Sequence, residues 1–169
     1  MRKIVSGFAA SLDGYITGAN GEIDWILIDK EIDFTEEFKR YDAFFYGRIT
    51  YEEVVKMGYA MPGIKNYVFS TTLKEVDKNY ILVNENVEQV VKELKEQEGK
   101  DIALYGGAKL LASLLNMNLV DEISVAIIPV LLGRGKPMVN VLNKYISLEL
   151  LNTKTYSNGT VRVTYNVKY

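Results

Sequence analysis

Cysteine and histidine are both absent from this chain of 169 residues. Without cysteine there are no disulfides, no thiolate ligands for zinc or iron–sulfur clusters, and no thiol nucleophile. Without histidine the chain lacks the usual general base, the base of a Ser-His-Asp triad and the commonest transition-metal ligand. We therefore expect no metal site, and any chemistry must come from carboxylates, lysine, tyrosine, backbone groups or a bound cofactor.

A basic excess and a long hydrophobic run are missing as well. The 20 Lys and Arg residues are outnumbered by 22 Asp and Glu residues, so the chain lacks the positive charge of phosphate-tracking nucleic-acid binders. Its longest uncharged stretch, residues 123–133, is about half of the roughly 20 residues that cross a bilayer. Residues 1–10 only faintly imitate a signal peptide, because Asp13 follows a minimal apolar run. We expect no nucleic-acid partner, no membrane contact and a cytoplasmic location.

The chain does contain enough apolar material for one folded domain. Apolar residues make up 48% of the sequence and charged residues 25%, which is an ordinary globular balance. Because a domain typically has roughly 100–200 residues, we expect residues 1–169 to form a single domain.

Strand and helix patterns alternate over the first three quarters of the chain. Short apolar or β-rich runs predict strands at residues 4–10, 42–47, 66–70, 80–83, 102–105 and 122–132. Between them, helical spacing is weak over residues 30–40 and clearer over residues 50–57, 87–98 and 109–115. Asn86, with Gln89 three residues later, predicts the cap of the third helix, and Gly99 predicts its end.

The C-terminal part contains only strand patterns. Residues 148–156 and 161–169 flank Asn158 and Gly159, and an Asn-Gly pair between β-rich runs is the strongest short hairpin signal. Together with the alternating first part, this predicts an α/β fold: a mostly parallel central sheet with helices on its faces and an antiparallel C-terminal hairpin. In such sheets ligands bind beyond the carboxyl ends of the strands.

Two glycine turns follow predicted strands at that edge. In YGGAKL, Gly106 and Gly107 precede a helix whose first N–H groups can receive an anion, although such a turn can also be only a tight connection. In GRITYE, Gly47 is followed by Arg48, which can clamp a phosphate, and by Thr50, which can add a hydroxyl. The alternative for the second turn is a surface arginine with a capping hydroxyl.

A third segment, FSTTL, places Ser70, Thr71 and Thr72 just past another strand, where hydroxyls bind phosphate or cap the turn. One elongated ligand with several phosphates would satisfy all three segments. In GRGK, Arg134 and Lys136 can hold an anionic substrate group or belong to a solvated turn.

Six motifs, taken in order, resemble the dihydrofolate reductase-like superfamily: SLDGYI (11–16), DW (24–25), YGRITYE (46–52), PGIKNYVFS (62–70), YGGAKL (105–110) and PVLLGRGKP (129–137). The closer resemblance is to the riboflavin-biosynthesis reductase (RibD C-terminal) domain family and its stand-alone relatives. The resemblance covers nearly the whole chain. It implies a three-layer dihydrofolate reductase-like fold and a hydride-transferring enzyme that uses NADPH, often as a dimer.

The same resemblance implies which residues contact NADPH. Arg48 and Ser70, with Thr71 and Thr72 beside it, would surround the 2′-phosphate. The remaining contacts fall on strand ends and helix starts: Gly47 and Thr50 at the phosphates, Gly106, Gly107, Ala108 and Lys109 at the pyrophosphate, and the backbone of Ala9 and Ile16 at the nicotinamide amide.

The substrate side departs from dihydrofolate reductases. The arginine that normally follows the PG turn is replaced by Ile64, and the carboxylate expected after Trp25 falls on Lys30, with Asp29 only a neighbour. Folate is therefore not the expected substrate. Asp13, in the SLDG motif, is predicted as the substrate-facing carboxylate and candidate proton donor, with a turn-capping aspartate as the alternative.

Trp25 and Arg134 complete the predicted substrate contacts. We therefore predict an NADPH-dependent reductase of a small heterocyclic or ribose-bearing substrate, resembling 5-amino-6-(5-phosphoribosylamino)uracil reductase and working as a homodimer. Two alternatives stay open: a nucleotide-binding module without turnover, and a self-associating domain whose interface draws on the 12 tyrosines.

Overall fold

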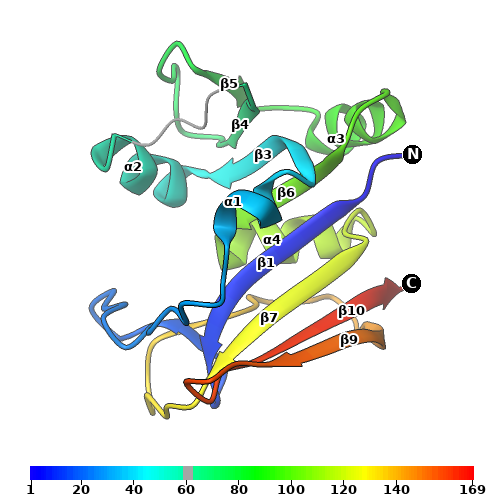
Figure 1. Ribbon diagram of the computed structural model, residues 1–169. Coiled ribbons are helices and arrows are strands. Elements are labelled where there is room, and N and C mark those ends of the chain that lie inside the picture. Colours follow the sequence, from blue (N-terminus) through cyan, green and yellow to red (C-terminus); the bar gives the residue numbers. More distant parts are fainter. Residues whose placement is uncertain (59–62) are drawn as a thin grey trace.

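The computed structural model describes residues 1–58 and 63–169. Its main feature is an eight-stranded sheet in the order β5-β4-β3-β6-β1-β7-β10-β9 (Figure 1). The strands are β1 Ile4–Ser11, β3 Tyr41–Gly47, β4 Lys65–Phe69, β5 Tyr80–Val83, β6 Asp101–Gly106, β7 Glu122–Ile128, β9 Ser147–Thr155 and β10 Val161–Lys168. The first six strands of that order are mutually parallel, whereas β10 is antiparallel to both β7 and β9. Strands β2 (Tyr15–Thr17) and β8 (Lys136–Pro137) form a separate two-stranded ribbon.

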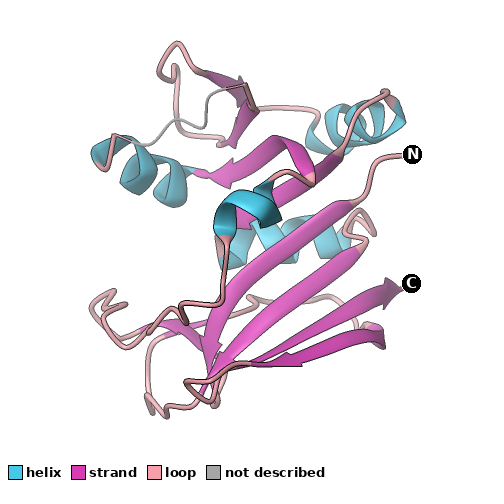
Figure 2. Cartoon of the chain, in the orientation of Figure 1, coloured by secondary structure: helices cyan, strands magenta, loops and turns pink. Residues whose placement is uncertain are grey.

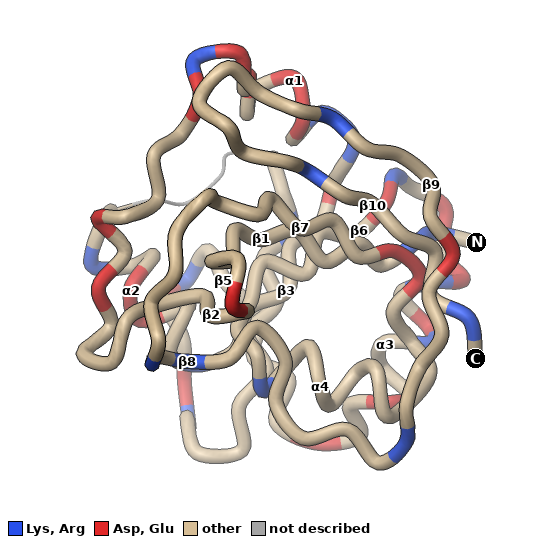
Figure 3. Tube along the Cα trace, turned by 90° about the horizontal axis from the view of Figure 1, so that it is seen from below, with Lys and Arg blue, Asp and Glu red and all other residues tan. Residues whose placement is uncertain are grey.

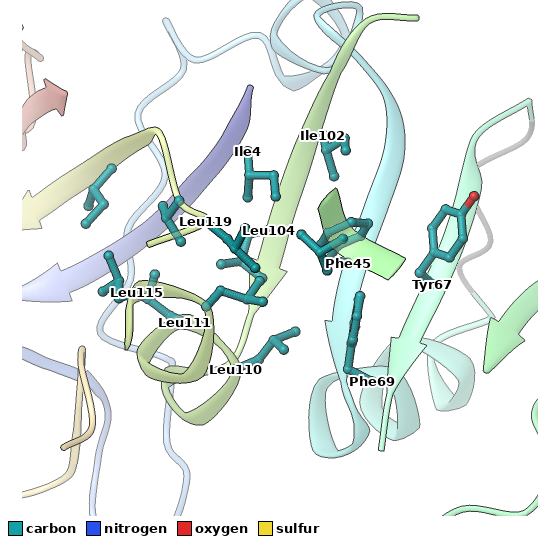
Figure 4. Packing of buried hydrophobic residues seen from close by; sticks show 14 of the residues in the cluster. Ile4, Phe45, Tyr67, Phe69, Ile102, Leu104, Leu110, Leu111, Leu115 and Leu119 are labelled. Atoms are coloured by element: carbon teal, nitrogen blue, oxygen red, sulfur yellow. The ribbon is translucent and has the colours of Figure 1, made fainter. Parts of the chain in front are cut away.

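Helices cover both faces of the sheet and so make three layers. They are α1 Phe34–Phe38, α2 Arg48–Lys56, α3 Val87–Glu96 and α4 Ala108–Asn116. On one face, apolar residues of α3 and α4 pack against Phe45 and Leu104 (Figure 4). On the other face, Phe44 and Tyr46 pack with residues of α1 and α2. Strand β3 therefore supplies both cores, because its neighbouring side chains point to opposite faces.

The second face of the sheet is only partly covered. Figure 2 shows no helix in front of β7, β10 and β9, and the short α1 lies nearer to β6 and β1. Residues of β1, β7 and β10 line a cavity on this face. Among the described residues, no helix combines the length and the apolar character that crossing a membrane requires.

The structure confirms the predicted α/β fold, with its mostly parallel sheet and its C-terminal hairpin. In the hairpin turn Tyr156 N donates to the Thr160 carbonyl at 2.9 Å, and Gly159 has a φ of +85°. That left-handed conformation favours glycine. The Asn-Gly pair therefore predicted the hairpin correctly, although the hairpin turn is longer than two residues.

Four local predictions are wrong. The weak helix over residues 30–40 shrinks to α1, and β7 ends at Ile128 because Pro129 has no N–H for the ladder. Asn86 precedes α3 but adopts a left-handed φ of 50° and makes no side-chain cap, and α3 ends at Glu96, before Gly99. Pro62 of the predicted PG turn lies outside the described residues.

At the amino ends of the strands, charged side chains form ion pairs with one another. Buried Glu122 accepts hydrogen bonds from Lys3 Nζ at 2.7 Å and Arg40 Nη2 at 2.8 Å. Burial alone would raise the pKa of Glu122, but these hydrogen bonds outweigh it and hold the pKa below 4.5. Charge at the amino ends of the strands therefore forms ion pairs within the fold, and the predicted phosphate-binding segments lie at the carboxyl ends.

Candidate functional site

The three predicted phosphate-binding segments lie at neighbouring strand ends. Strand β3 pairs with β4 through Gly47 and Phe69, and with β6 through Tyr46 and Gly106. Ser70 follows Phe69 directly, so the hydroxyl segment and both glycine turns meet at the carboxyl ends of β3, β4 and β6, here called the strand-end edge.

The two glycine turns are in close contact with each other. A Cβ atom on Gly47 would lie 3.5 Å from both Gly106 O and Gly107 N, and one on Gly106 would lie 3.3 Å from Thr50 Oγ1. Gly106 has a φ of +138°, which favours glycine, and its peptide bond to Gly107 is cis. The contact leaves little space for side chains and brings two backbones within reach of one ligand.

Each turn leads into a helix that starts without a side-chain cap. The N-cap residues are Gly47 for α2 and Gly107 for α4, and glycine has no side chain that could cap the first N–H groups. The N-terminus of a helix also carries partial positive charge, which favours anions. Lys109, in the first turn of α4, is exposed and adds a formal positive charge. Two helix starts therefore offer N–H groups at the same edge.

Arg48, the first residue of α2, lies exposed beside these helix starts. Its Nη1 donates to both carboxylate oxygens of Glu52, at 2.8 and 3.0 Å. A guanidinium has five N–H donors in total, so this pair leaves Nη2 and Nε able to bind a ligand. Glu52 holds the side chain at the edge, and a phosphate would have to compete with a solvent-exposed ion pair of low energy.

The Ser70 hydroxyl caps its own turn. Its Oγ accepts hydrogen bonds from Thr72 N at 3.2 Å and Leu73 N at 3.1 Å. This is the capping arrangement that the sequence left open as the alternative. Thr71 and Thr72 are exposed next to it, and the Thr72 hydroxyl lies 3.3 Å from Ser70 Oγ.

A cavity of about 1160 Å³ adjoins this edge on the incompletely covered face of the sheet. Small residues form its floor: Gly7, Ala9, Ala103, Ser124 and Ala126. Its roof is apolar and comes from the segment between β2 and α1, including Ile26, Leu27 and Ile28. Of the predicted contacts, Ala9 and Ile16 line this cavity, which places the predicted nicotinamide end next to it. The cavity suits a flat ligand with a large apolar surface.

The sequence prediction missed the aromatic wall of this cavity. Phe38, Phe44, Tyr46 and Tyr105 line it, and the rings of Phe44 and Tyr105 stack with centroids 5.8 Å apart. Burial raises the pKa of Tyr46 well above its usual value, so its hydroxyl stays protonated. Alternation along β3 and β6 points to buried faces, but no local motif distinguishes a cavity wall from a core.

Asp13, the predicted substrate carboxylate, lies outside the cavity lining and is engaged in a turn. Its carboxylate accepts from Ser11 Oγ at 2.7 Å, Gly133 N at 2.7 Å and Leu132 N at 3.1 Å. The Ser11 hydrogen bond, together with the two backbone ones, holds the pKa of Asp13 below 3.8. Asp13 is therefore an ionised acceptor that ties the GRGK turn to the end of β1, as a capping aspartate would.

Arg134 and Trp25 also lie outside the cavity lining. The pKa of Glu22 is held below its usual value by hydrogen bonds from the backbone of Glu22 itself and from Asn20. Nearby Arg134 makes a smaller contribution. Trp25 Nε1 donates to Glu22 O at 3.0 Å. These predicted substrate residues gather in one cluster of loops beside the cavity, rather than within it.

Asp29 fastens the cavity roof to the C-terminal hairpin. Its buried carboxylate accepts from Ser157 Oγ at 2.7 Å and Asn158 N at 2.9 Å, and Asn158 Nδ2 donates to Leu27 O at 2.8 Å. Hydrogen bonds from Glu31 N and Ser157 hold the pKa of Asp29 below its usual value. Asp29 is thus a structural acceptor, and it is not among the residues that line the cavity.

The donor set at the strand ends fits NADPH. Two uncapped helix starts suit a pyrophosphate, an exposed guanidinium suits a further phosphate, and the apolar cavity beside Ala9 suits a nicotinamide ring.

Comparison with known proteins identifies relatives along the whole chain. The family model of the RibD C-terminal domain matches residues 2–162. The uncharacterized protein YyaP of Bacillus subtilis (strain 168) is 38% identical over 181 residues, which cover 98% of this chain and 95% of YyaP. The crystal structure of a putative riboflavin biosynthesis protein from Shewanella sp. PV-4 is similar with a TM-score of 0.86 and 25% identity, over 99% of each chain.

The fold extends to a more distant relative. The dihydrofolate reductase from Enterococcus faecalis, solved in complex with NADP(H) and RAB-propyl, matches with a TM-score of 0.75 at 17% identity. The match covers 99% of this chain and 97% of that one. The chain therefore has the dihydrofolate reductase-like fold that its motifs predict.

Proposed function

Because the chain belongs to the RibD C-terminal domain family, we propose that it is an NADPH-dependent reductase of a small heterocyclic or ribose-bearing substrate. The observation that carries this proposal is the contact between the Gly47 turn and the Gly106–Gly107 turn, each leading into an uncapped helix, beside an apolar cavity. When bound, NADPH supplies a hydride, so the chain itself needs no histidine or metal.

The protein's own residues would bind and orient the two reactants. The helix starts at Gly47 and Gly107, with Thr50, would hold the pyrophosphate, and Arg48 with the Ser70 turn would hold the 2′-phosphate. The floor at Ala9 and the apolar roof would keep water away from the reacting ring. Asp13 would position the GRGK turn, with Arg134, at the mouth of the cavity.

Cofactor oxidation tests the proposal directly. NADPH absorbance is followed with a panel that contains the pyrimidine intermediate of riboflavin synthesis, dihydrofolate and small carbonyl compounds. We expect turnover with a heterocyclic member of the panel and none with dihydrofolate. Tight NADPH binding without turnover across a broadened panel would favour the nucleotide-binding module, and absence of NADPH binding would refute both.

A homodimer is part of the same proposal and is supported by the edge strand β9. Every residue of β9 is exposed, including Leu148 at 45% and Leu150 at 55%. An exposed edge strand with apolar side chains readily pairs with another chain. Sedimentation equilibrium at micromolar concentration should give twice the mass of the chain, and Leu150→Lys should shift the protein toward monomer. A wild-type protein that stays monomeric would refute the dimer.

A further inference from the structure

A row of four residues crosses the sheet from the predicted nicotinamide end to the far edge. Ala9 on β1 pairs with Ala126 on β7, Ala126 pairs with Arg162 on β10, and Arg162 pairs with Lys154 on β9. All four residues line the cavity. Since neighbouring strands lie about 4.8 Å apart, the backbone of Arg162 is about 10 Å, and that of Lys154 about 14 Å, from that of Ala9.

The two ends of this row differ in size and charge. The alanines leave space for a flat ring, whereas the far end carries two long cationic side chains. Figure 3 shows basic positions on β9 and β10 side by side, close to α1. The cavity therefore has an apolar end for a ring and a cationic end about two to three strand spacings away.

The two cations converge on one buried ring. Lys154 Nζ lies 4.6 Å from the centroid of the Tyr156 ring, and Arg162 Cζ lies 5.6 Å from it. A single carboxylate, that of Glu37 on α1, forms an ion pair with Arg162. Among the described residues Lys154 has no acidic partner. An anion at this end would therefore meet one uncompensated positive charge and a guanidinium with further N–H donors.

The buried hydroxyl of Thr160 is an independent observation that favours a ligand at this end of the cavity. Thr160 lines the same cavity, is 1% exposed, and its Oγ1 is the one buried side-chain oxygen in the described part of the chain without a hydrogen bond. A buried polar atom without a partner is unfavourable, so a ligand atom that reached this hydroxyl would stabilise the site.

From this arrangement we propose that Arg162 and Lys154 bind an anionic group of the substrate, a phosphate or a carboxylate. The group ends a tail that runs from a ring over Ala9 and Ala126 to Arg162 and Lys154, whose backbones lie about 10 and 14 Å from that of Ala9. The identity of the bound molecule as a substrate rests on the proposed reductase function, whereas the binding itself can be measured without NADPH.

Riboflavin and FMN are suitable probes, because both contain a flat fluorescent ring and a ribityl tail and differ only in the terminal phosphate. Each is titrated into the full chain without NADPH, and quenching of the flavin fluorescence is followed. We expect FMN to bind about tenfold more tightly than riboflavin, and the advantage to shrink at high salt. Equal affinities of the wild-type protein for the two flavins would overturn the proposal.

Variants locate the phosphate. Lys154→Ala and Arg162→Gln should each lower the FMN affinity about fivefold and leave the riboflavin affinity unchanged. Lys92→Ala, on α3 at the opposite face of the sheet, is the matched control and should change nothing. If Arg48→Ala removes the advantage and Lys154→Ala does not, the phosphate binds at the helix starts and the proposal fails.

Two further measurements complete the test. Pteroate, whose ring bears a tail that ends in a carboxylate, should lose affinity in Lys154→Ala if any anion suffices, and should be unaffected if the site needs a phosphate. A parallel NADPH titration distinguishes failure of the proposed reductase function from failure of the proposed anion site. Failure of NADPH binding with a Lys154-dependent FMN advantage refutes the reductase alone, and the reverse pattern refutes only the anion site.

Discussion

The strand-end edge and the adjoining cavity are built in different ways. The edge is formed by backbone groups of short sequence segments, where Gly47 and Gly106 allow two turns to touch. The cavity is lined by residues of seven strands, of α1 and α2 and of a roof segment, and only strand register brings Ala9, Ala126 and Arg162 into one row. Ligand binding at the edge therefore depends on chain conformation, whereas ligand choice in the cavity depends on side-chain volume and charge.

We expect the two regions to respond separately to substitution. Changes at the edge should weaken NADPH binding and leave substrate selection intact. Changes in the cavity at residues other than Ala9 and Ile16 should alter substrate KM and leave NADPH affinity intact, because these two are the predicted cofactor contacts that line the cavity.

The largest effect is expected for Gly106→Ala. A non-glycine residue at a φ of +138° is strained, and the new Cβ would lie 3.3 Å from Thr50 Oγ1. We expect about 1–3 kcal/mol less stability in denaturant unfolding and a loss of NADPH affinity of about 100-fold in calorimetry. Gly7→Ala is the matched control, since a Cβ there meets nothing within 4 Å. Unchanged NADPH affinity in a folded Gly106→Ala protein would contradict the role of the turn.

Arg48→Ala should have the next largest effect. A hydrogen bond to a charged group contributes roughly 1.5–3 kcal/mol, and the exposed position of Arg48 favours the lower end, so NADPH affinity should fall about tenfold. NADH affinity should barely change, because NADH lacks the 2′-phosphate. Lys56→Ala, on the same helix and paired with Glu53, is the control. An unchanged NADPH/NADH preference would remove Arg48 from the phosphate site.

Ala126→Leu tests the cavity side of the comparison. The larger side chain would fill the floor between Ala9 and Arg162, so substrate KM should rise about fivefold, while NADPH affinity stays the same. Ala126→Ser keeps the volume nearly constant and serves as the control. A parallel loss of NADPH affinity and substrate affinity would show that the two regions do not act separately.

The smallest effect is expected for Asp13→Asn. Because its hydrogen bonds hold the pKa of Asp13 below 3.8, the carboxylate is charged at neutral pH and has no proton to donate. The dependence of kcat/KM on pH should keep its shape between about pH 6 and 8. Asp24→Asn, in the neighbouring loop, is the control. If kcat/KM of the wild-type protein changes with pH in this range and that change disappears in Asp13→Asn, Asp13 is the proton donor instead.

Local chemistry explains which parts could be predicted from the sequence. Glycine pairs after apolar runs, and Asn158–Gly159 between two β-rich runs, are short-range signals that fix turns within a few residues. The strand ends and the hairpin were predictable for this reason. The end of β7 at Ile128 was predictable too, because Pro129 follows, but the apolar run beyond it obscured that signal.

Long-range contacts explain what the sequence could not reveal. Asp29 looks like one more loop acid, and its hydrogen bonds to Ser157 and Asn158 exist only because the hairpin folds back onto the roof. Arg162 and Lys154 lie in different strands and become neighbours through register alone. Capping by Asn86 failed because its backbone adopts a left-handed conformation, which no local pattern specified.

We propose that the two glycine turns and their helix starts together bind NADPH. Calorimetric titration of the wild-type protein with NADPH and, separately, with NADH tests it most directly. We expect saturable binding of NADPH, about tenfold tighter than binding of NADH. No binding of NADPH at high micromolar concentration, or equal affinities for the two cofactors, would contradict it.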